Sequence, residues 1–182
     1  MNYGRIFNYD IANGVGVRTA LFVSGCRHHC KGCFNPETWD FDYGEPYTAA
    51  TEEEIISTLN NQNIDGISLL GGEPMEPENQ PYIRRLVERA KKEYPQKTIW
   101  MYSGYTFEEL TDMENDRCHT ADTLAILKCV DILVDGEFVL DKKNISLRFR
   151  GSENQRIIDV PATFDAGEVV LSEYMRTVRG LN

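Results

Sequence analysis

The sequence predicts an α/β protein in which a mainly parallel sheet forms a partial, open (β/α) barrel. Short apolar runs alternate along the chain with stretches of amphipathic helical periodicity, which is typical of parallel strands joined by crossover helices. About four to six strands are too few to close an eight-stranded barrel, so we expect an open sheet. The pattern leaves a doubly wound sheet as an alternative.

The first half of the chain contains two predicted strands. A glycine-rich turn at residues 13–18 precedes Thr19–Ser24, whose apolar and partly β-branched residues predict a buried strand. Residues 34–50 are rich in Pro, Gly, Tyr and Asp and are expected to form a loop. Thr51–Glu54 has the form of a capping box and predicts the start of a helix. The second strand is predicted at Gly66–Leu70.

The second half continues the alternation. Residues 79–93 predict an amphipathic helix, and Thr98–Tyr102 predicts a third strand. Thr106–Glu109 is another capping box. A helix around residues 121–129 leads to the fourth predicted strand, Asp131–Val134.

Glycine or polar residues follow all four predicted strands. They are the cysteine loop 26–33, Gly71-Gly72-Glu73, Ser103-Gly104 and Asp135-Gly136. In parallel α/β folds the chemistry takes place at the carboxyl ends of the strands. These four segments therefore indicate a functional site at that edge of the sheet.

The composition is that of a soluble globular protein, with one core expected for 182 residues. The formal net charge is −10, which disfavours nucleic-acid binding because phosphate backbones require basic surface. No apolar run approaches the ~20 residues of a membrane span. The first residues, MNYGRIFNYD, lack the features of a secretory signal. We therefore expect a cytoplasmic protein that does not associate with membranes.

The most informative motif is Cys26-x3-Cys30-x2-Cys33, with no fourth cysteine nearby. A structural zinc site, or a cluster held by cysteines alone, normally uses four ligands. Three thiolates on one loop can hold three corners of a four-iron cube and leave one iron open to a small molecule. Disulfides are disfavoured because cytosolic thiols stay reduced. A zinc site completed by His28, His29 or His119 is the remaining alternative.

This motif after the first strand, with Gly71-Gly72-Glu73 after the second, resembles the radical S-adenosylmethionine (SAM) superfamily. Within it the chain resembles the activating enzymes of glycyl radical enzymes, most closely the activating proteins of anaerobic ribonucleoside-triphosphate reductases. The segments that carry the resemblance are residues 13–18, 21–26, 66–68, 133–136, 148–152 and 154–156. We expect a radical SAM domain over residues 1–160 and a C-terminal extension over residues 161–182.

The resemblance implies two cofactors, a [4Fe–4S] cluster and SAM. The reduced cluster passes one electron to SAM, which gives methionine and a 5′-deoxyadenosyl radical. This radical takes a hydrogen atom from a backbone glycine of the large reductase subunit, the protein partner. The electron comes from a low-potential donor such as flavodoxin. The implied metal ligands are Cys26, Cys30 and Cys33, and the implied cofactor contacts are Gly32, Cys33, Phe34, Gly71, Gly72, Glu73, Ser103 and Asp135.

Glycines after the second strand permit close backbone approach, so that a carbonyl of Gly71 or Gly72 can meet the SAM amino group. Glu73 either accepts a hydrogen bond from that group or orients the loop. Ser103 is expected to contact the methionyl carboxylate or the ribose, or only to end a strand. Asp135 is expected to contact the ribose, or to cap a turn.

Gly32 stands where the superfamily commonly has an aromatic residue, and the reductase activators resemble this chain in having glycine there. Adenine contacts by Gly32, Cys33 and Phe34 are therefore expected mainly through the backbone. A cluster of arginines is expected to form either an ion-pair network or a surface that docks the protein partner: Arg148, Arg150 and Arg156.

Apart from the three cysteines of the motif, the cysteines and histidines are not expected to bind metal. His28 and His29 would lie behind the ligands or at the surface, Cys118 would be a loop thiol, and Cys129 would be buried. Three other functions remain: activation of another glycyl radical enzyme, radical chemistry on a small purine-like substrate, and a zinc-stabilised interaction module without catalysis. Iron-rich, brown protein favours the cluster, and colourless, zinc-only protein favours the module.

Overall fold

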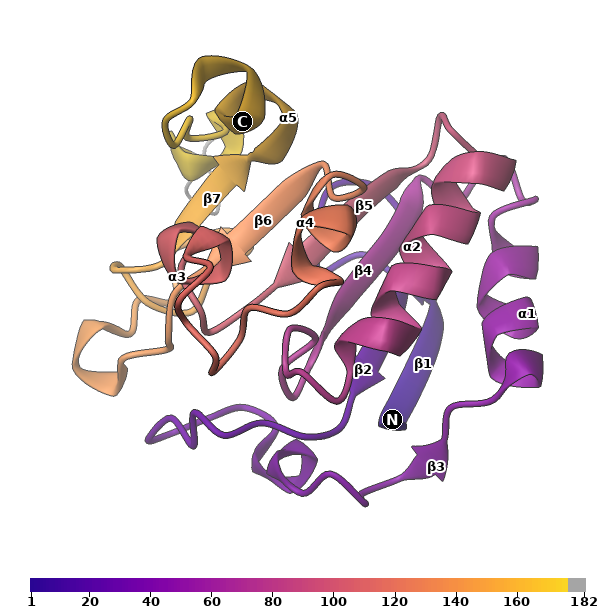
Figure 1. Cartoon of the computed structure of the whole chain (residues 1–182), viewed down its shortest axis with the longest axis horizontal. Coiled ribbons are helices and arrows are strands. Elements are labelled where there is room, and N and C mark those ends of the chain that lie inside the picture. Colours follow the sequence, from indigo (N-terminus) through magenta and orange to yellow (C-terminus); the bar gives the residue numbers. More distant parts are fainter. Residues whose placement is uncertain (177–182) are drawn as a thin grey trace.

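Residues 1–176, which the computed structural model describes, contain an open seven-stranded sheet in the order β3-β1-β2-β4-β5-β6-β7 (Figure 1). The strands are β1 (Asn2–Asp10), β2 (Arg18–Val23), β3 (Glu45–Pro46), β4 (Gly66–Gly71), β5 (Thr98–Tyr102), β6 (Ile132–Asp135) and β7 (Arg156–Asp159). The α-helices are α1 (Ala49–Thr58), α2 (Gln80–Glu93), α3 (Phe107–Thr111), α4 (Thr123–Leu127) and α5 (Val160–Ala166). Short 3-10 helices are η1 (Pro36–Trp39), η2 (Leu140–Lys142) and η3 (Glu173–Arg176).

The central strands β2, β4, β5 and β6 run parallel to one another. Helical crossovers join them, with α1 between β2 and β4, α2 between β4 and β5, and α3 with α4 between β5 and β6. The outer strands β1, β3 and β7 pair in antiparallel orientation. The prediction of an open α/β sheet is therefore confirmed, but the sheet is mixed rather than mainly parallel.

The sequence pattern does not predict β1, β3, β7 or α5. Residues of β1 are half-buried or exposed throughout, so this strand lacks the continuous apolar run that marks a buried strand. The two residues of β3 are both exposed. The short strand β7 owes its place to pairing with β6, from Ile132 with Asp159 to Asp135 with Arg156. Such a long-range contact leaves no local sequence pattern.

Capping residues define where two helices begin. Thr48 is the N-cap of α1. Its hydroxyl accepts a hydrogen bond from the Thr51 N–H, and the Thr51 hydroxyl accepts one from the Thr48 N–H. The predicted start at Thr51 is therefore wrong, because Thr51 is the third residue of the helix and the cap is Thr48. The predicted box of Thr106 and Glu109 at the start of α3 is confirmed. No helix in residues 1–176 has the length and apolar composition needed to cross a membrane.

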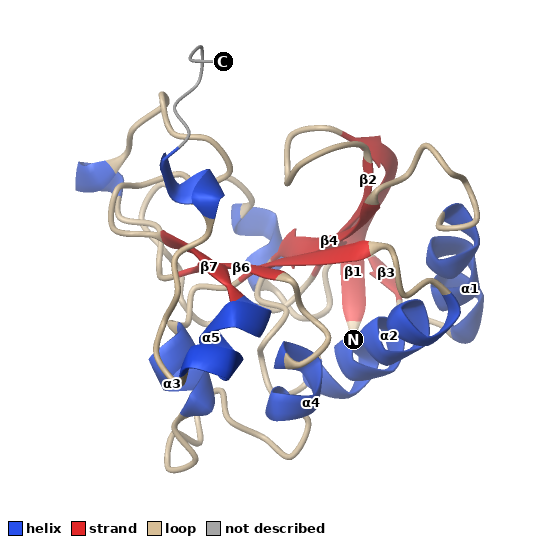
Figure 2. Cartoon of the chain, turned by 90° about the horizontal axis from the view of Figure 1, so that it is seen from above, coloured by secondary structure: helices blue, strands red, loops and turns tan. Residues whose placement is uncertain are grey.

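The two faces of the sheet differ. Alternate residues of the central strands, such as Leu21, Leu69 and Met101, pack with the helices in the main core. Figure 2 shows α1, α2 and α4 on this side of the sheet. The opposite face carries smaller apolar clusters, one around Phe22 and Leu70 and another around Trp100. The helices of the main core do not cover this second face, so it can border a cavity.

Candidate functional site

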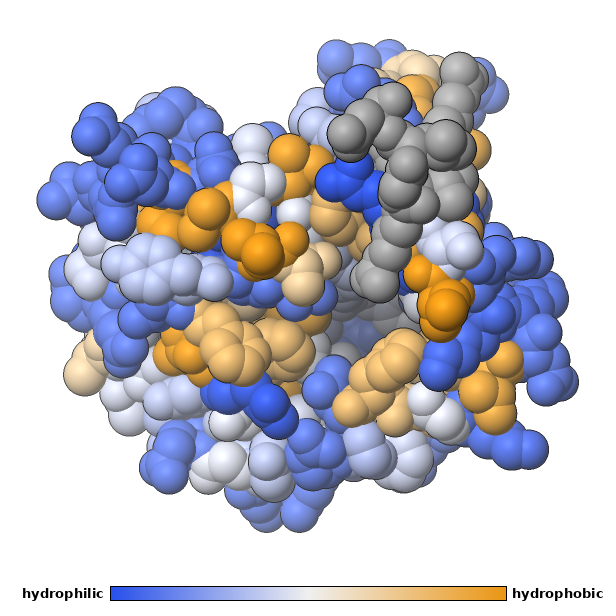
Figure 3. All heavy atoms as spheres, turned by 180° about the vertical axis from the view of Figure 1, so that it is seen from behind, coloured by the Kyte–Doolittle hydropathy of each residue, from blue (hydrophilic) through white to orange (hydrophobic). Residues whose placement is uncertain are grey.

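A cavity of about 600 Å³ opens at the carboxyl ends of the four parallel strands. Figure 3 shows this side of the molecule, where apolar side chains surround a hollow. Eight predicted site residues line the cavity: Cys26, Cys30, Cys33, Phe34, Gly71, Gly72, Glu73 and Ser103. Gly32 and Asp135 are not among the lining residues, although Gly136 is. The loops after β2, β4, β5 and β6 thus meet in one place.

The cysteine loop places three free thiols at this cavity. Cys26 is buried, and Cys30 and Cys33 are half-buried. The Cys33 N–H donates to the Cys30 carbonyl at 3.0 Å, which closes a turn between these two residues. Burial raises the pKa of the Cys26 thiol to about 12, and the nearby Glu73 carboxylate adds to the shift. Such a thiol is protonated at neutral pH and becomes a ligand when a metal cation stabilises the thiolate.

The glycine turn after β4 is bonded directly to the start of the cysteine loop. The Gly72 N–H donates to the Val23 carbonyl at 2.8 Å, and the Glu73 N–H donates to the Gly25 carbonyl at 2.8 Å. A Cβ at Gly72 would lie 2.6 Å from the Gly25 oxygen and 2.8 Å from the Thr38 oxygen. Glycine is therefore required here for backbone packing within the protein. Because these N–H groups are already used, a ligand at this turn would meet carbonyl oxygens.

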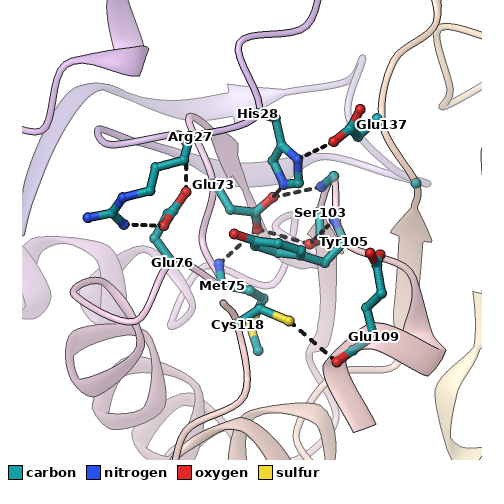
Figure 4. Close-up of polar contacts among 12 residues, drawn as sticks. Arg27, His28, Glu73, Met75, Glu76, Ser103, Tyr105, Glu109, Cys118 and Glu137 are labelled. Atoms are coloured by element: carbon teal, nitrogen blue, oxygen red, sulfur yellow. Dashed lines mark hydrogen bonds and ion pairs between the residues drawn. The ribbon is translucent and has the colours of Figure 1, made fainter. Parts of the chain in front are cut away.

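Glu73 is buried, and both of its carboxylate oxygens bind protein groups (Figure 4). Oε1 accepts from the Met75 N–H at 2.8 Å and from the Ser103 hydroxyl at 2.9 Å. Oε2 accepts from the Gly104 N–H at 2.7 Å and lies 3.2 Å from His28 Nε2. Of the two sequence hypotheses for Glu73, this geometry favours orientation of the loop over a direct cofactor contact.

His28 was expected either behind the ligands or at the surface, and the structure buries it. Its side chain is 3% exposed, with Nδ1 2.7 Å from Glu137 Oε1. Desolvation lowers the pKa of His28, but the two carboxylates Glu73 and Glu137 outweigh it and raise that pKa to about 9. The neighbouring His29 is exposed and stacks on Trp39, with ring centroids 4.7 Å apart. The two adjacent histidines therefore have different environments.

Asp135 is buried and binds within the protein. Its carboxylate accepts from the Phe107 N–H at 2.8 Å, at the start of α3, and from the Arg156 guanidinium. Arg156 also pairs with Glu108. Of the two sequence hypotheses for Asp135, capping fits this geometry, although what it caps is α3 rather than a turn at Gly136.

The other two arginines of the predicted cluster behave differently. Arg150 is half-buried and donates to the carbonyls of Glu153, Gln155 and Met175. Arg148 is exposed, with its guanidinium 4.9 Å from the centre of the Phe149 ring. Among the contacts of residues 1–176, only Arg156 of these three belongs to an ion-pair network, and Arg150 instead stabilises the fold of the loop that borders the cavity.

The remaining cysteines lie away from the cavity. Cys118 lies in a turn between α3 and α4, as predicted, but it is fully buried in the core, and its thiol donates to the Glu109 carbonyl at 3.4 Å. The His119 Nδ1 lies 2.8 Å from the Leu110 carbonyl. Cys129 is half-buried and packs against the main core. Among residues 1–176, no three His, Cys, Asp or Glu side chains converge as they would around a single metal ion.

Several lining residues are absent from the sequence-based site, among them Tyr102, Phe149 and Gln155. Tyr102 is the last residue of β5 and precedes Ser103, so its position at a strand end was the available signal. Phe149 and Gln155 come from the irregular segment between β6 and β7, and their place in residues 148–152 and 154–156, two of the segments that carry the family resemblance, was the available signal. Gln155 accepts from the Gly151 N–H at 2.8 Å and donates to the Gly136 carbonyl at 3.0 Å.

The residues present fit a [4Fe–4S] cluster and SAM. Three free thiols border the same cavity as the glycine turn, which is the donor set of a cluster with one open iron. The Tyr102 hydroxyl and the Trp39 indole nitrogen are buried without a hydrogen-bond partner in the described residues, and both side chains belong to the lining. Buried polar atoms of this kind are normally satisfied by a ligand or water. The volume also suits a small-molecule site.

Comparison with known proteins gives a consistent result. A family model described as "4Fe-4S single cluster domain" matches residues 12–158. The chain is 45% identical over 157 residues to the anaerobic ribonucleoside-triphosphate reductase-activating protein of Escherichia coli, covering 85% of this chain and 96% of that protein. Proteins of the same name are 43% identical over 159 residues in Vibrio cholerae (86% and 97% covered) and 42% identical over 161 residues in Pasteurella multocida (86% and 96% covered).

Proposed function

The chain belongs to the family of anaerobic ribonucleoside-triphosphate reductase-activating proteins, and we propose that it activates such a reductase by generating a glycyl radical on it. The observation that carries the proposal is the single cavity shared by the three thiols and the glycine turn, in a chain that matches its relatives over 85% of its length. No acid–base pair or nucleophile is needed, because the cofactors carry the difficult chemistry.

We propose Cys26, Cys30 and Cys33 as the ligands of a [4Fe–4S] cluster. When bound, the cluster supplies the electron that cleaves SAM, and the carbon-centred fragment so released takes the hydrogen atom from the partner's glycine. The cysteine loop contributes placement: Gly25 N–H donates to the Thr38 carbonyl at 2.9 Å and Cys26 N–H to the Trp39 carbonyl at 3.2 Å, which tie the loop to η1.

We propose that SAM occupies the cavity beside the thiols. A carbonyl of the turn Gly71-Gly72 is suited to its amino group, since the N–H groups there donate to β2 and the cysteine loop. Phe34 is 63% exposed at the cavity wall and is suited to a flat, apolar group such as adenine. Gly32, with φ of +77°, shapes the turn between Cys30 and Cys33, so its proposed contribution to adenine binding is through the backbone.

We also propose that the open sheet is a partial (β/α) barrel of the radical SAM type, formed by residues 1–160, with residues 161–182 as an extension, of which residues 177–182 lie outside the described part of the chain. Four parallel strands with helical crossovers and a cavity at their carboxyl ends support this assignment. A cluster of this kind can have a potential as low as roughly −700 mV, so a low-potential donor such as flavodoxin is the expected electron source. The proposed location is the cytoplasm, where such donors and the reductase substrates are found.

The function is tested with anaerobically reconstituted, reduced protein. With SAM alone we expect slow formation of methionine and 5′-deoxyadenosine. Addition of an anaerobic ribonucleoside-triphosphate reductase should make that reductase active in ribonucleotide reduction. Cleavage of SAM together with turnover of a small purine-like compound, and no activation of the reductase, would exclude the proposal.

A further inference from the structure

One imidazole, that of His28, contacts the loops that follow the other three parallel strands (Figure 4). His28 itself lies in the loop after β2. Its Nε2 is 3.2 Å from Glu73, after β4, and its Nδ1 is 2.7 Å from Glu137, after β6. The ring packs against Tyr105, after β5, with the ring centroids 4.3 Å apart. All four loops that border the cavity therefore meet at this side chain.

The imidazole is closely seated against the backbone of the loop after β5. A Cβ at Gly104 would lie 2.5 Å from His28 Nε2, so no other residue type fits opposite the ring without a shift. The Nε2 atom is buried and lies close to Glu73 Oε2 without the alignment of a hydrogen bond. The aligned bond is that of Nδ1 with Glu137.

Removal of the imidazole would change the environment of Glu73 most. The other donors to this buried carboxylate are two backbone N–H groups and the Ser103 hydroxyl, all neutral. Without the imidazole a gap would open beside this buried carboxylate, and the loop that carries Glu73 would shift to regain polar contacts. The glycine turn Gly71-Gly72 immediately precedes Glu73 and would shift with it.

The residue before His28 makes a parallel contact. The Arg27 N–H donates to Glu76 Oε1 at 2.7 Å, and its guanidinium pairs with Glu76 and Glu78. Glu76 is fully buried. Two adjacent residues between Cys26 and Cys30 thus each reach a buried carboxylate of the segment that follows the glycine turn. The residues between Cys26 and Cys30 therefore bind the cysteine loop to that segment, besides linking the two thiols.

We propose that His28 is a positioning residue, which holds the cysteine loop against the loops after β4, β5 and β6 and so fixes the spacing between the thiols and the glycine turn. This inference rests on the proposed function, because only a ligand that spans the cluster and the turn requires that spacing. His28 borders the cavity, but both of its ring nitrogens face protein carboxylates, so its proposed role is to position the loops.

The test uses anaerobically reconstituted protein and compares His28→Ala and His28→Gln with wild type. Iron per chain, the dissociation constant for SAM, and the electron paramagnetic resonance (EPR) spectrum of the reduced cluster with and without SAM are measured. We expect His28→Ala to retain iron, because all three cysteines remain. Loss of the imidazole's contacts with Glu73 and Glu137 should raise the dissociation constant for SAM about tenfold. The SAM-induced change in the EPR spectrum should need correspondingly more SAM.

His28→Gln is the conservative variant, since its amide can donate to Glu73, and it should recover much of the SAM affinity. His29→Ala is the matched control in the same loop, since His29 is exposed and contacts Trp39 instead; its dissociation constant should equal that of wild type. An unchanged constant in His28→Ala would overturn the proposal. Loss of iron in both His28 variants would also overturn it, because His28 would then hold the cluster itself. A wild-type chain that bound neither iron nor SAM would instead refute the proposed function.

Discussion

Substitution of Gly72 by alanine tests how the glycine turn and the cysteine loop are joined. The added Cβ would lie 2.6 Å from the Gly25 oxygen and 2.8 Å from the Thr38 oxygen, and both are backbone atoms that cannot rotate away. The backbone φ at Gly72 is outside the left-handed region, so the effect is steric rather than conformational. Overpacking of this kind costs about 1–3 kcal/mol. The cysteine loop should move, and Cys26, next to Gly25, should move with it.

Two measurements check this prediction. Denaturant unfolding of the metal-free chain should show the loss of stability, and iron per chain after reconstitution should fall because Cys26 is displaced. Gly4→Ala is the matched control: its Cβ would also come within 2.9 Å of another atom, but that atom is in the Tyr43 ring, which can turn aside. Wild-type stability and iron content in Gly72→Ala would refute the steric argument.

Three further predictions concern the thiols, the open iron and acid stability. Cys30→Ala should lose the cluster while Cys129→Ala keeps it, as measured by iron content; equal losses would contradict the assigned ligands. Air should bleach the visible absorbance of the cluster while far-ultraviolet circular dichroism persists; a cluster stable for days would indicate a fully ligated site. Hydrogen bonding to Arg156 lowers the pKa of Glu108, so its stabilisation is complete above the unfolded value of about 4.3 and is lost as pH falls through the lower folded value. Glu108→Gln should therefore reduce the acid-induced loss of unfolding free energy by under about 1 kcal/mol, because this side chain is largely exposed. An unchanged acid-induced loss would show that Glu108 does not contribute to it.

The central strands and the cavity edge were predictable because their signals are local. Apolar runs such as Thr98–Tyr102 are continuous, and glycine or polar residues follow each one. The spacing of Cys26, Cys30 and Cys33 can be recognised without any knowledge of the fold. These features lie in short stretches of sequence, which is why the positions of β2, β4, β5 and β6 follow closely from the pattern.

The partners of buried charges were not predictable. Glu73 and Asp135 stand at strand ends, where the sequence suggests ligand contacts, but the groups that bind their carboxylates come from distant segments. His28 is 45 residues from Glu73 and 109 residues from Glu137 in the sequence. Neither pairing leaves a local pattern, and the same is true of the antiparallel strand β7. The sequence thus indicates where polar groups gather. Whether each of them contacts a ligand or binds other protein groups depends on the three-dimensional contacts.

The most direct test of the central claim is EPR spectroscopy of the reduced, cluster-loaded protein mixed with SAM and an anaerobic ribonucleoside-triphosphate reductase. The account predicts an organic radical on the reductase, whose hyperfine splitting decreases when the reductase glycines carry deuterium at the α carbon. Absence of that radical, or a radical whose splitting does not respond to the deuterium, would contradict the assignment of this protein as a glycyl-radical-generating activase.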